Sequence, residues 1–151
     1  MDDQGLQTEL TRVVSSIPDK ESAARRLARV IATRFGYRWV GIYEVGKDEI
    51  FVLGWDGPRA PAHPRFPRTK GLCGKAVLSR AAVRVDDVTK DPDYLTTHES
   101  TRAELVVPVL TTGMEVVGVI DVESDQVGAF GEQDVGALQA CAAALRPLWT
   151  G

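Results

Sequence analysis

Three carboxylic acids stand in segments that are otherwise apolar, and they are the residues with the clearest chemical potential. Asp121 and Glu123 share one face of a strand that is predicted to begin at residue 115, and Glu104 opens a second strand over residues 104–110. A carboxylate inside so apolar a strand costs free energy unless it meets a partner or water. The group therefore favours a cationic or zwitterionic ligand over a cyclic nucleotide, whose phosphate it would repel. In the alternative interpretation, Glu123 marks the end of the strand and only Asp121 is unusual.

Cys73 lies where a thiol can be activated. It falls in the first turn of a helix predicted over residues 71–80, behind Gly71, where free backbone N–H groups and the helix dipole can lower a thiol pKa. The residue is either a reactive or ligand-contacting thiol, or a small hydrophobic residue buried in a tight turn. The other cysteine, Cys141, has the helical spacing of a core residue. Two cysteines without CxxC spacing exclude a disulfide scaffold.

Two aromatic residues and two histidines complete the candidates. Trp39 and Tyr43 lie four residues apart on one face of a predicted strand, where aromatic residues are favoured and often form ordinary sheet core. His63 and His98 lie in polar loops and are interpreted as exposed. The histidines and cysteines show no metal-ligand spacing, so we expect no metal and no cofactor.

Hydrophobic periodicity predicts the elements that position these residues. Helical spacing predicts helices over residues 4–17, 19–36 and 71–80, and a last helix after residue 132 that carries Val135, Leu138, Cys141, Leu145 and Leu148 on one face. Alternating and β-branched segments predict two hairpins, over residues 39–55 and 104–122, a short strand over 82–85 and one edge strand within 56–70. Helices that bracket two hairpins indicate an α+β fold with a mainly antiparallel sheet.

Composition limits the class of protein. The 151 residues are 44% hydrophobic and 26% charged, which is typical of one globular domain, here expected over residues 19–151 behind an N-terminal helix over 1–18. An acidic, polar N-terminus and the absence of a run of about 20 apolar residues predict a cytoplasmic protein without a membrane span. The net charge is −3. The richest basic cluster, Arg25, Arg26, Arg29 and Arg34, fits the solvated face of a helix, so nucleic acid is not favoured as a partner.

Four strings in order are similar to those of a GAF domain over about residues 20–148, and within that family to the free methionine-(R)-sulfoxide reductases. The strings are residues 39–43 (WVGIY), 71–76 (GLCGKA), 104–109 (ELVVPV) and 118–124 (GVIDVES). The resemblance implies a twisted sheet with the terminal helices on one face. Short helices and loops on the other face would enclose a small-molecule pocket, with the acidic residues around a ligand ammonium group. The expected ligand-binding residues are Trp39, Tyr43, Cys73, Glu104, Asp121 and Glu123.

The resemblance also implies where a reductase would keep its thiols. The nucleophilic cysteine of those enzymes aligns with Thr97 and one resolving cysteine aligns with His63, whereas Cys73 is retained. A threonine hydroxyl lacks the acidity and soft nucleophilicity that attack on sulfur needs. We therefore expect a non-catalytic sensor or regulatory module that binds a small polar molecule. The alternatives are a divergent reductase that uses Cys73, and a structural dimerisation module without a ligand.

A homodimer is expected through the terminal helices. Residues 4–17 form a helix too short to be stable alone, so its apolar stripe must pack against something. That stripe consists of Leu6, Leu10, Val13, Val14 and Ile17. Helices of two chains can bury the stripe in a bundle, and GAF domains commonly associate in this way. In the alternative, the first helix folds back onto its own domain.

Overall fold

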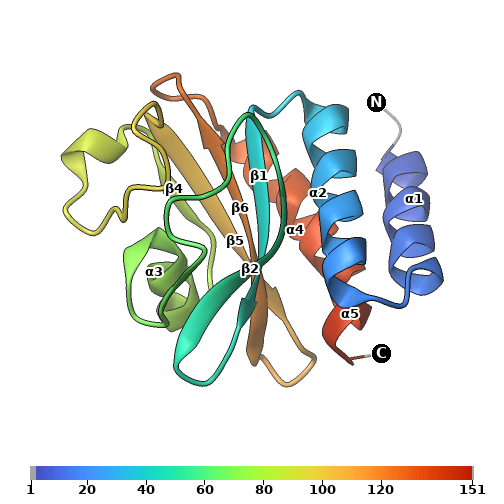
Figure 1. Ribbon diagram of the computed structural model, residues 1–151. Helices are drawn as coiled ribbons and strands as arrows, with labels where there is room; N and C mark the ends of the chain where they lie inside the picture. The colour runs from blue at the N-terminus through green and yellow to red at the C-terminus, as the bar shows by residue number, and fades with distance from the viewer. Residues whose placement is uncertain (1–2, 151) are drawn as a thin grey trace.

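The computed structural model describes residues 3–150 and shows a six-stranded antiparallel sheet with helices on both faces (Figure 1). The strands are β1 (Trp39–Val45), β2 (Glu49–Asp56), β3 (Arg65–Pro67), β4 (Val83–Val85), β5 (Ala103–Leu110) and β6 (Val116–Ser124). The helices are α1 (Asp3–Ser16), α2 (Lys20–Phe35), α3 (Gly71–Ser79), the 3₁₀ turn η1 (Val88–Lys90), α4 (Glu132–Leu145) and α5 (Pro147–Thr150). The strand order β3-β2-β1-β6-β5-β4 confirms the predicted α+β class and puts the short strand β3 at an edge.

The two faces of the sheet carry different layers. Figure 1 shows α1, α2 and α4 stacked against one face, while α3 and the long loops lie against the other. Alternation along β1 divides the core accordingly: Val40 and Ile42 pack under the helices, whereas Trp39 and Tyr43 face α3. The implied placement of the terminal helices is confirmed, and the layer beneath α3 is where the candidate residues meet.

Local signals account for the boundaries of α2. The side chain of Asp19 accepts a hydrogen bond from Ser22 N at 2.9 Å, which satisfies a free donor of the first turn. Gly36 ends the helix in the left-handed conformation, with φ 71°. The exposed side chains of Arg25, Arg26 and Arg29 project from the outer face of this helix, as the solvated-face interpretation requires.

The last helix is shorter than predicted. α4 ends at Leu145, and Leu148 lies in the separate short helix α5. The physical reason is Pro147, which has no N–H to continue the ladder of i to i−4 hydrogen bonds. The rest of the predicted face is correct, since Leu138, Cys141 and Leu145 are fully buried against the sheet.

The N-terminal helix packs on its own domain. Leu6, Leu10 and Val13 are buried in the helix-side core together with α2 and α4. Only Val14 and Ile17 of the predicted stripe stay half-buried at its edge. Within residues 3–150, no helix combines the length and the apolar content that crossing a lipid bilayer requires.

Candidate functional site

Strand register brings the three carboxylic acids together in the middle of the sheet. Glu104 on β5 stands directly opposite Glu123 on β6, and Asp121 lies two residues along β6 on the same face. Their exposed fractions are 3%, 1% and 1%. β5 and β6 are central strands, so the acidic floor that these three residues form has further strands on both sides within the sheet.

Aromatic side chains of β1 form the wall beside the acidic floor. The register pairs Trp39 with Glu123 and Gly41 with Asp121. Gly41 leaves room for the rings of Trp39 and Tyr43, because a Cβ there would lie 2.5 Å from Trp39 Cη2 and 2.8 Å from Tyr43 Cε1. Trp39 is further held by a 2.9 Å hydrogen bond from its Nε1 to the carbonyl oxygen of Arg59.

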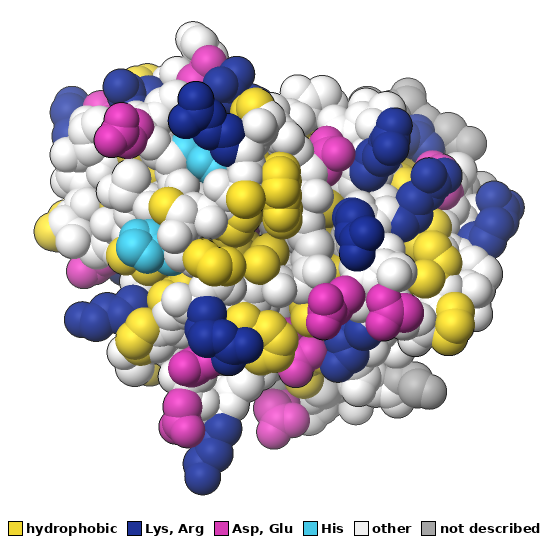
Figure 2. All heavy atoms as spheres, in the orientation of Figure 1, with side chains coloured by type: hydrophobic (Ala, Val, Ile, Leu, Met, Phe, Trp, Pro, Cys, Tyr) yellow, Lys and Arg dark blue, Asp and Glu magenta, His cyan; other side chains and the backbone are white. Residues whose placement is uncertain are grey.

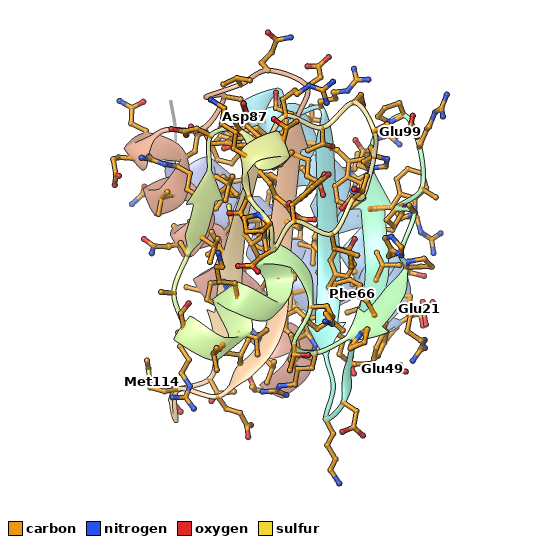
Figure 3. All side chains as sticks on the ribbon, turned by 90° about the vertical axis from the view of Figure 1, so that its left-hand side faces the viewer. Glu21, Glu49, Phe66, Asp87, Glu99 and Met114 are labelled. Atoms are coloured by element: carbon orange, nitrogen blue, oxygen red, sulfur yellow. The ribbon has the colours of Figure 1, made fainter. Side chains whose placement is uncertain are left out.

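Helix α3 covers the acidic floor. Figure 3 views the molecule from this side and shows α3 crossing in front of the sheet, with Phe66 beside it. Leu72 and Cys73, in the first turn of α3, are buried against the strands. One ligand-type atom from each of Cys73, Glu104 and Asp121 lies within 4.8 Å of the others.

The space above the floor is narrow. A cavity of about 20 Å³ remains, enough for one water molecule and too small for an organic ligand. It is lined by Tyr43, His63, Phe66, Gly71, Leu72, Cys73, Leu95, Thr97, Glu104 and Asp121. The two loops above it are joined by a 3.1 Å hydrogen bond from Ala62 N to the carbonyl oxygen of Thr97. An organic ligand can reach the floor only when these loops separate.

A wider, open chamber lies on the Trp39 side of the cavity. Its volume is about 510 Å³, and Thr97 lines both spaces. Glu123 reaches it from the sheet, and its lining carries the charges of Arg38 and Arg59 together with those of Glu99 and Asp125. The chamber therefore adjoins the acidic floor at Glu123.

Burial determines the protonation of the floor. It raises the pKa of Glu104, Asp121 and Glu123 well above the ordinary values of carboxyls, and the negative charge of each neighbour raises it further. The hydroxyl of Thr101 donates a hydrogen bond to Glu123 Oε1 at 2.8 Å. Asp121 Oδ1 and Glu123 Oε2 are buried without a hydrogen-bond partner. The floor therefore holds its protons more tightly than exposed carboxyls do, and two of its oxygens can still accept a hydrogen bond.

Of the two interpretations of Cys73, the structure favours the small residue buried in a tight turn over the reactive thiol. Burial raises the pKa of its thiol well above the usual range, and Asp121, Glu104 and Glu123 add to the effect. Cys141 is buried on the opposite face of the sheet, in α4. The sheet therefore separates the two sulfur atoms, which cannot form a dithiol pair in this fold.

The two histidines differ in burial. His63 is exposed as predicted, although it also lines the cavity. His98 is half-buried, contrary to expectation, because its ring packs edge-on against Trp39 with centroids 5.2 Å apart. Burial and the nearby Arg38 lower its pKa. Figure 2 shows both histidines on the half of the surface that carries α3 and the loops.

All six expected ligand-binding residues lie in one layer, on three strands and α3. Sequence reasoning missed Thr101, and it missed Arg38 and Arg59 of the chamber. Thr101 precedes β5 by two residues, yet only the register shows that it meets Glu123. The sequence around the two arginines has no pattern that would indicate that they line the same chamber.

Comparison with known proteins identifies the family of this chain. The GAF domain family model matches residues 19–146. GAF domain-containing protein A of Dictyostelium discoideum is 30% identical over 129 residues, which cover 83% of this chain and 80% of that protein. Free methionine-R-sulfoxide reductase of Escherichia coli is 30% identical over 108 residues, which cover 71% of this chain and 63% of the enzyme.

A solved structure shows the same relationship in three dimensions. The free methionine-R-sulfoxide reductase of Neisseria meningitidis, in complex with its substrate, superposes with a TM-score of 0.86 at 30% identity, and the match covers 98% of this chain and 88% of that one. Sequence and fold therefore agree over nearly the whole chain. The protein belongs to the GAF domain family and is closely related to the free methionine-R-sulfoxide reductases within it.

Proposed function

We propose that this GAF domain is a cytoplasmic, non-catalytic sensor module that binds a small polar molecule through an ammonium group. The observation that carries the proposal is the acidic floor of Glu104, Asp121 and Glu123, which is buried and retains two carboxylate oxygens without hydrogen-bond partners. None of the salt bridges recorded between described residues involves the floor. An external cation would supply the missing positive charge.

An ammonium group suits this floor by its number of donors. It carries three N–H groups and no acceptor, so it can donate to Glu104, Asp121 and Glu123 together. Each charge-assisted hydrogen bond of this kind contributes about 1.5–3 kcal/mol. Trp39 and Tyr43 would cover the apolar part of the ligand, since both rings border the floor.

Ligand entry requires the loops over the cavity to open. The Ala62–Thr97 hydrogen bond is the backbone contact between them, and one such bond costs only about 1 kcal/mol to break. The open chamber at Glu123 then becomes continuous with the floor. The free energy of ligand binding to the acidic floor can offset the cost of breaking this hydrogen bond.

A thermal-shift screen tests the proposal with a panel of amines, amino acids and their sulfoxides. A ligand at 100 times its Kd raises the free energy of unfolding by about 2.7 kcal/mol. Stabilisation by ammonium compounds, and not by their N-acetylated counterparts, supports the proposal. A screen in which the charged amines give no more stabilisation than the acetylated ones favours the structural module without a ligand.

A second candidate function is reduction of free methionine sulfoxide, and the relatives favour it. The enzyme of Escherichia coli named above is 30% identical to this chain. The arrangement of sulfur counts against it: Cys73 is buried with a raised thiol pKa, and Cys141 lies across the sheet. Threonine and histidine, at Thr97 and His63, line the cavity where further thiols would be needed.

The expected result of an activity assay is therefore negative. With thioredoxin or dithiothreitol as reductant, turnover of free methionine sulfoxide should stay below ~1 s⁻¹, an ordinary enzyme rate. The reason is that thiol–disulfide exchange needs a thiolate and a second thiol in reach. Faster turnover that is lost in Cys73→Ser and kept in Cys141→Ser would establish the reductase instead.

We also propose that the protein forms a homodimer through its terminal helices. The half-buried edge of α1 forms one side of a groove of about 620 Å³ with the end of α4 and α5. Apolar residues on this groove are Val14, Ile17, Ala143, Ala144 and Leu148. A second copy that presents the same groove would remove this surface from water across a two-fold axis.

Light scattering coupled to size exclusion tests the dimer. At ~50 μM protein, on the weak side of micromolar affinities, the expected mass is twice the 16.4 kDa of the chain. Val14→Lys should shift the mass to that of a monomer, because it places a charge in the groove. A wild-type mass near 16 kDa would show that the helix serves only its own domain.

A further inference from the structure

We propose that Cys73, Glu104 and Asp121 form a binding site for one divalent transition-metal ion of the zinc class. Among residues 3–150, these three form the group whose sulfur and carboxylate oxygens come within 4.8 Å of one another. The sequence pattern predicts no metal site, because the three residues are far apart in the chain and come from α3, β5 and β6. The inference does not depend on the ammonium ligand.

The spacing of the donor atoms is close to that of a coordinated ion. Zinc binds thiolate sulfur at about 2.3 Å and carboxylate oxygen at about 2.0–2.2 Å, so tetrahedral ligands lie about 3.3–3.6 Å apart. Atoms within 4.8 Å of one another need to approach by only about 1 Å. Side-chain rotation of Glu104 and Asp121 can supply this movement without any shift of the strands.

An unpartnered atom at the site is the second observation. Asp121 is 1% exposed and lines the cavity, and its Oδ1 has no hydrogen-bond partner. A buried acceptor without a partner costs free energy that a bound cation would recover. The cavity of about 20 Å³ admits a single ion and excludes an organic cation while the loops are closed.

The donor set selects the class of metal. Magnesium and calcium ions prefer oxygen ligands alone, whereas a thiolate with carboxylates suits zinc and cobalt. An ammonium group gains little from a sulfur atom, so Cys73 distinguishes a metal site from an ammonium site. A water molecule in the cavity can complete the set as the fourth ligand.

Binding needs no redox partner. The sulfur of Cys73 and the oxygens of Glu104 and Asp121 donate electron pairs to the ion, and the thiol proton and any proton held by the two carboxyls pass to solvent or buffer. The oxidation states of sulfur and metal do not change. Because the ion and a ligand ammonium group would use the same oxygens of Glu104 and Asp121, each should exclude the other.

Titration of the full chain with Co²⁺ tests the site directly. The wild type should develop a thiolate-to-cobalt charge-transfer band in the near ultraviolet, and Zn²⁺ should displace it. Cys73→Ser should lose the band and weaken Zn²⁺ binding, measured by calorimetry, by more than the ~10–100-fold cost of losing an outer partner. The control Cys141→Ala removes the cysteine of the opposite core and should keep the band.

A second variant keeps the test decisive if Cys73→Ser folds poorly. Glu104→Gln preserves shape and the thiol, and it should weaken Zn²⁺ binding while circular dichroism shows an intact fold. The absence of a charge-transfer band in the wild type would overturn the proposal, as would equal Zn²⁺ affinity in wild type and Glu104→Gln. Neither result touches the ammonium proposal, which the thermal-shift screen decides on metal-free protein.

Discussion

Asp121→Asn is expected to stabilise the folded protein at neutral pH while it removes ligand binding. At pH 7 the free energy of unfolding should rise by about 1–3 kcal/mol, because each unit by which the folded pKa is raised costs the wild type about 1.4 kcal/mol once the pH lies above it. Affinity for an ammonium ligand should fall about 10-fold or more, because one charge-assisted hydrogen bond of about 1.5–3 kcal/mol is lost. We expect a residue that serves a binding site to lower the stability of the folded protein in this way.

The sign of the stability change follows from the pKa of Asp121. Burial raises this pKa well above its ordinary value, and Glu104 raises it further. The folded state therefore binds the proton more tightly than the unfolded chain does. The resulting stability is fully present below the ordinary carboxyl pKa of about 4, and it is lost as the pH rises towards the raised folded pKa. An amide does not ionise, so the variant avoids this loss.

Chemical denaturation at pH 5 and at pH 8 measures the effect. The difference in unfolding free energy between Asp121→Asn and the wild type should be larger at pH 8 than at pH 5. The control is Asp86→Asn, which changes an exposed aspartate and should leave both values within about 0.5 kcal/mol. A variant that is less stable than the wild type at pH 8 would contradict the burial argument.

Gly41→Ala is expected to lower stability and to destroy the site at once. The new Cβ would lie 2.5 Å from Trp39 Cη2 and 2.8 Å from Tyr43 Cε1. Both rings are 2% exposed, and the indole is tied to the carbonyl oxygen of Arg59, so neither ring can move without disturbing its surroundings. Overpacking of this kind costs about 1–3 kcal/mol.

Gly54→Ala is the matched control for Gly41→Ala. A Cβ at Gly54 would overlap Arg25 N and lie 2.7 Å from Ala24 C, in the backbone of α2 on the far face of the sheet. It should lower the midpoint of urea denaturation at least as much as Gly41→Ala does. Ligand affinity, measured well below the unfolding temperature, should be lost in Gly41→Ala and kept in Gly54→Ala. Equal affinity in both variants would show that the aromatic wall does not contact the ligand.

Local sequence signals predicted most of the fold because they act over a few residues. Asp19 and Gly36 bound α2 as expected, and the alternation along residues 39–44 correctly assigns Trp39 and Tyr43 to one face. The end of α4 was missed by three residues, since the apolar period continues to Leu148 beyond the break at Pro147. The surface against which α1 packs could not be predicted, because its apolar stripe fits its own domain and a second copy of the chain equally well.

The residues of the candidate site could be predicted from the sequence, whereas their burial and neighbours could not. Glu104, Asp121 and Glu123 are unusual because they are acidic residues in otherwise apolar strands. The structure brings them together. The choice between a reactive and a buried Cys73 could not be made from sequence, since helix position is visible there whereas the facing carboxyls of two other elements are not. The narrow cavity depends on how loops 57–64 and 86–102 pack, and neither has a periodic pattern.

Calorimetric titration with a matched ligand pair tests the central claim most directly. L-methionine sulfoxide and its N-acetyl derivative differ at the amine, so the pair isolates the contribution of the ammonium group. Metal-free wild-type protein should bind the amino acid at least 10-fold more tightly than the acetylated compound, and Asp121→Asn should abolish this preference. Equal affinity of the wild type for the two compounds, or a preference that survives in Asp121→Asn, would show that the acidic floor does not hold an ammonium group.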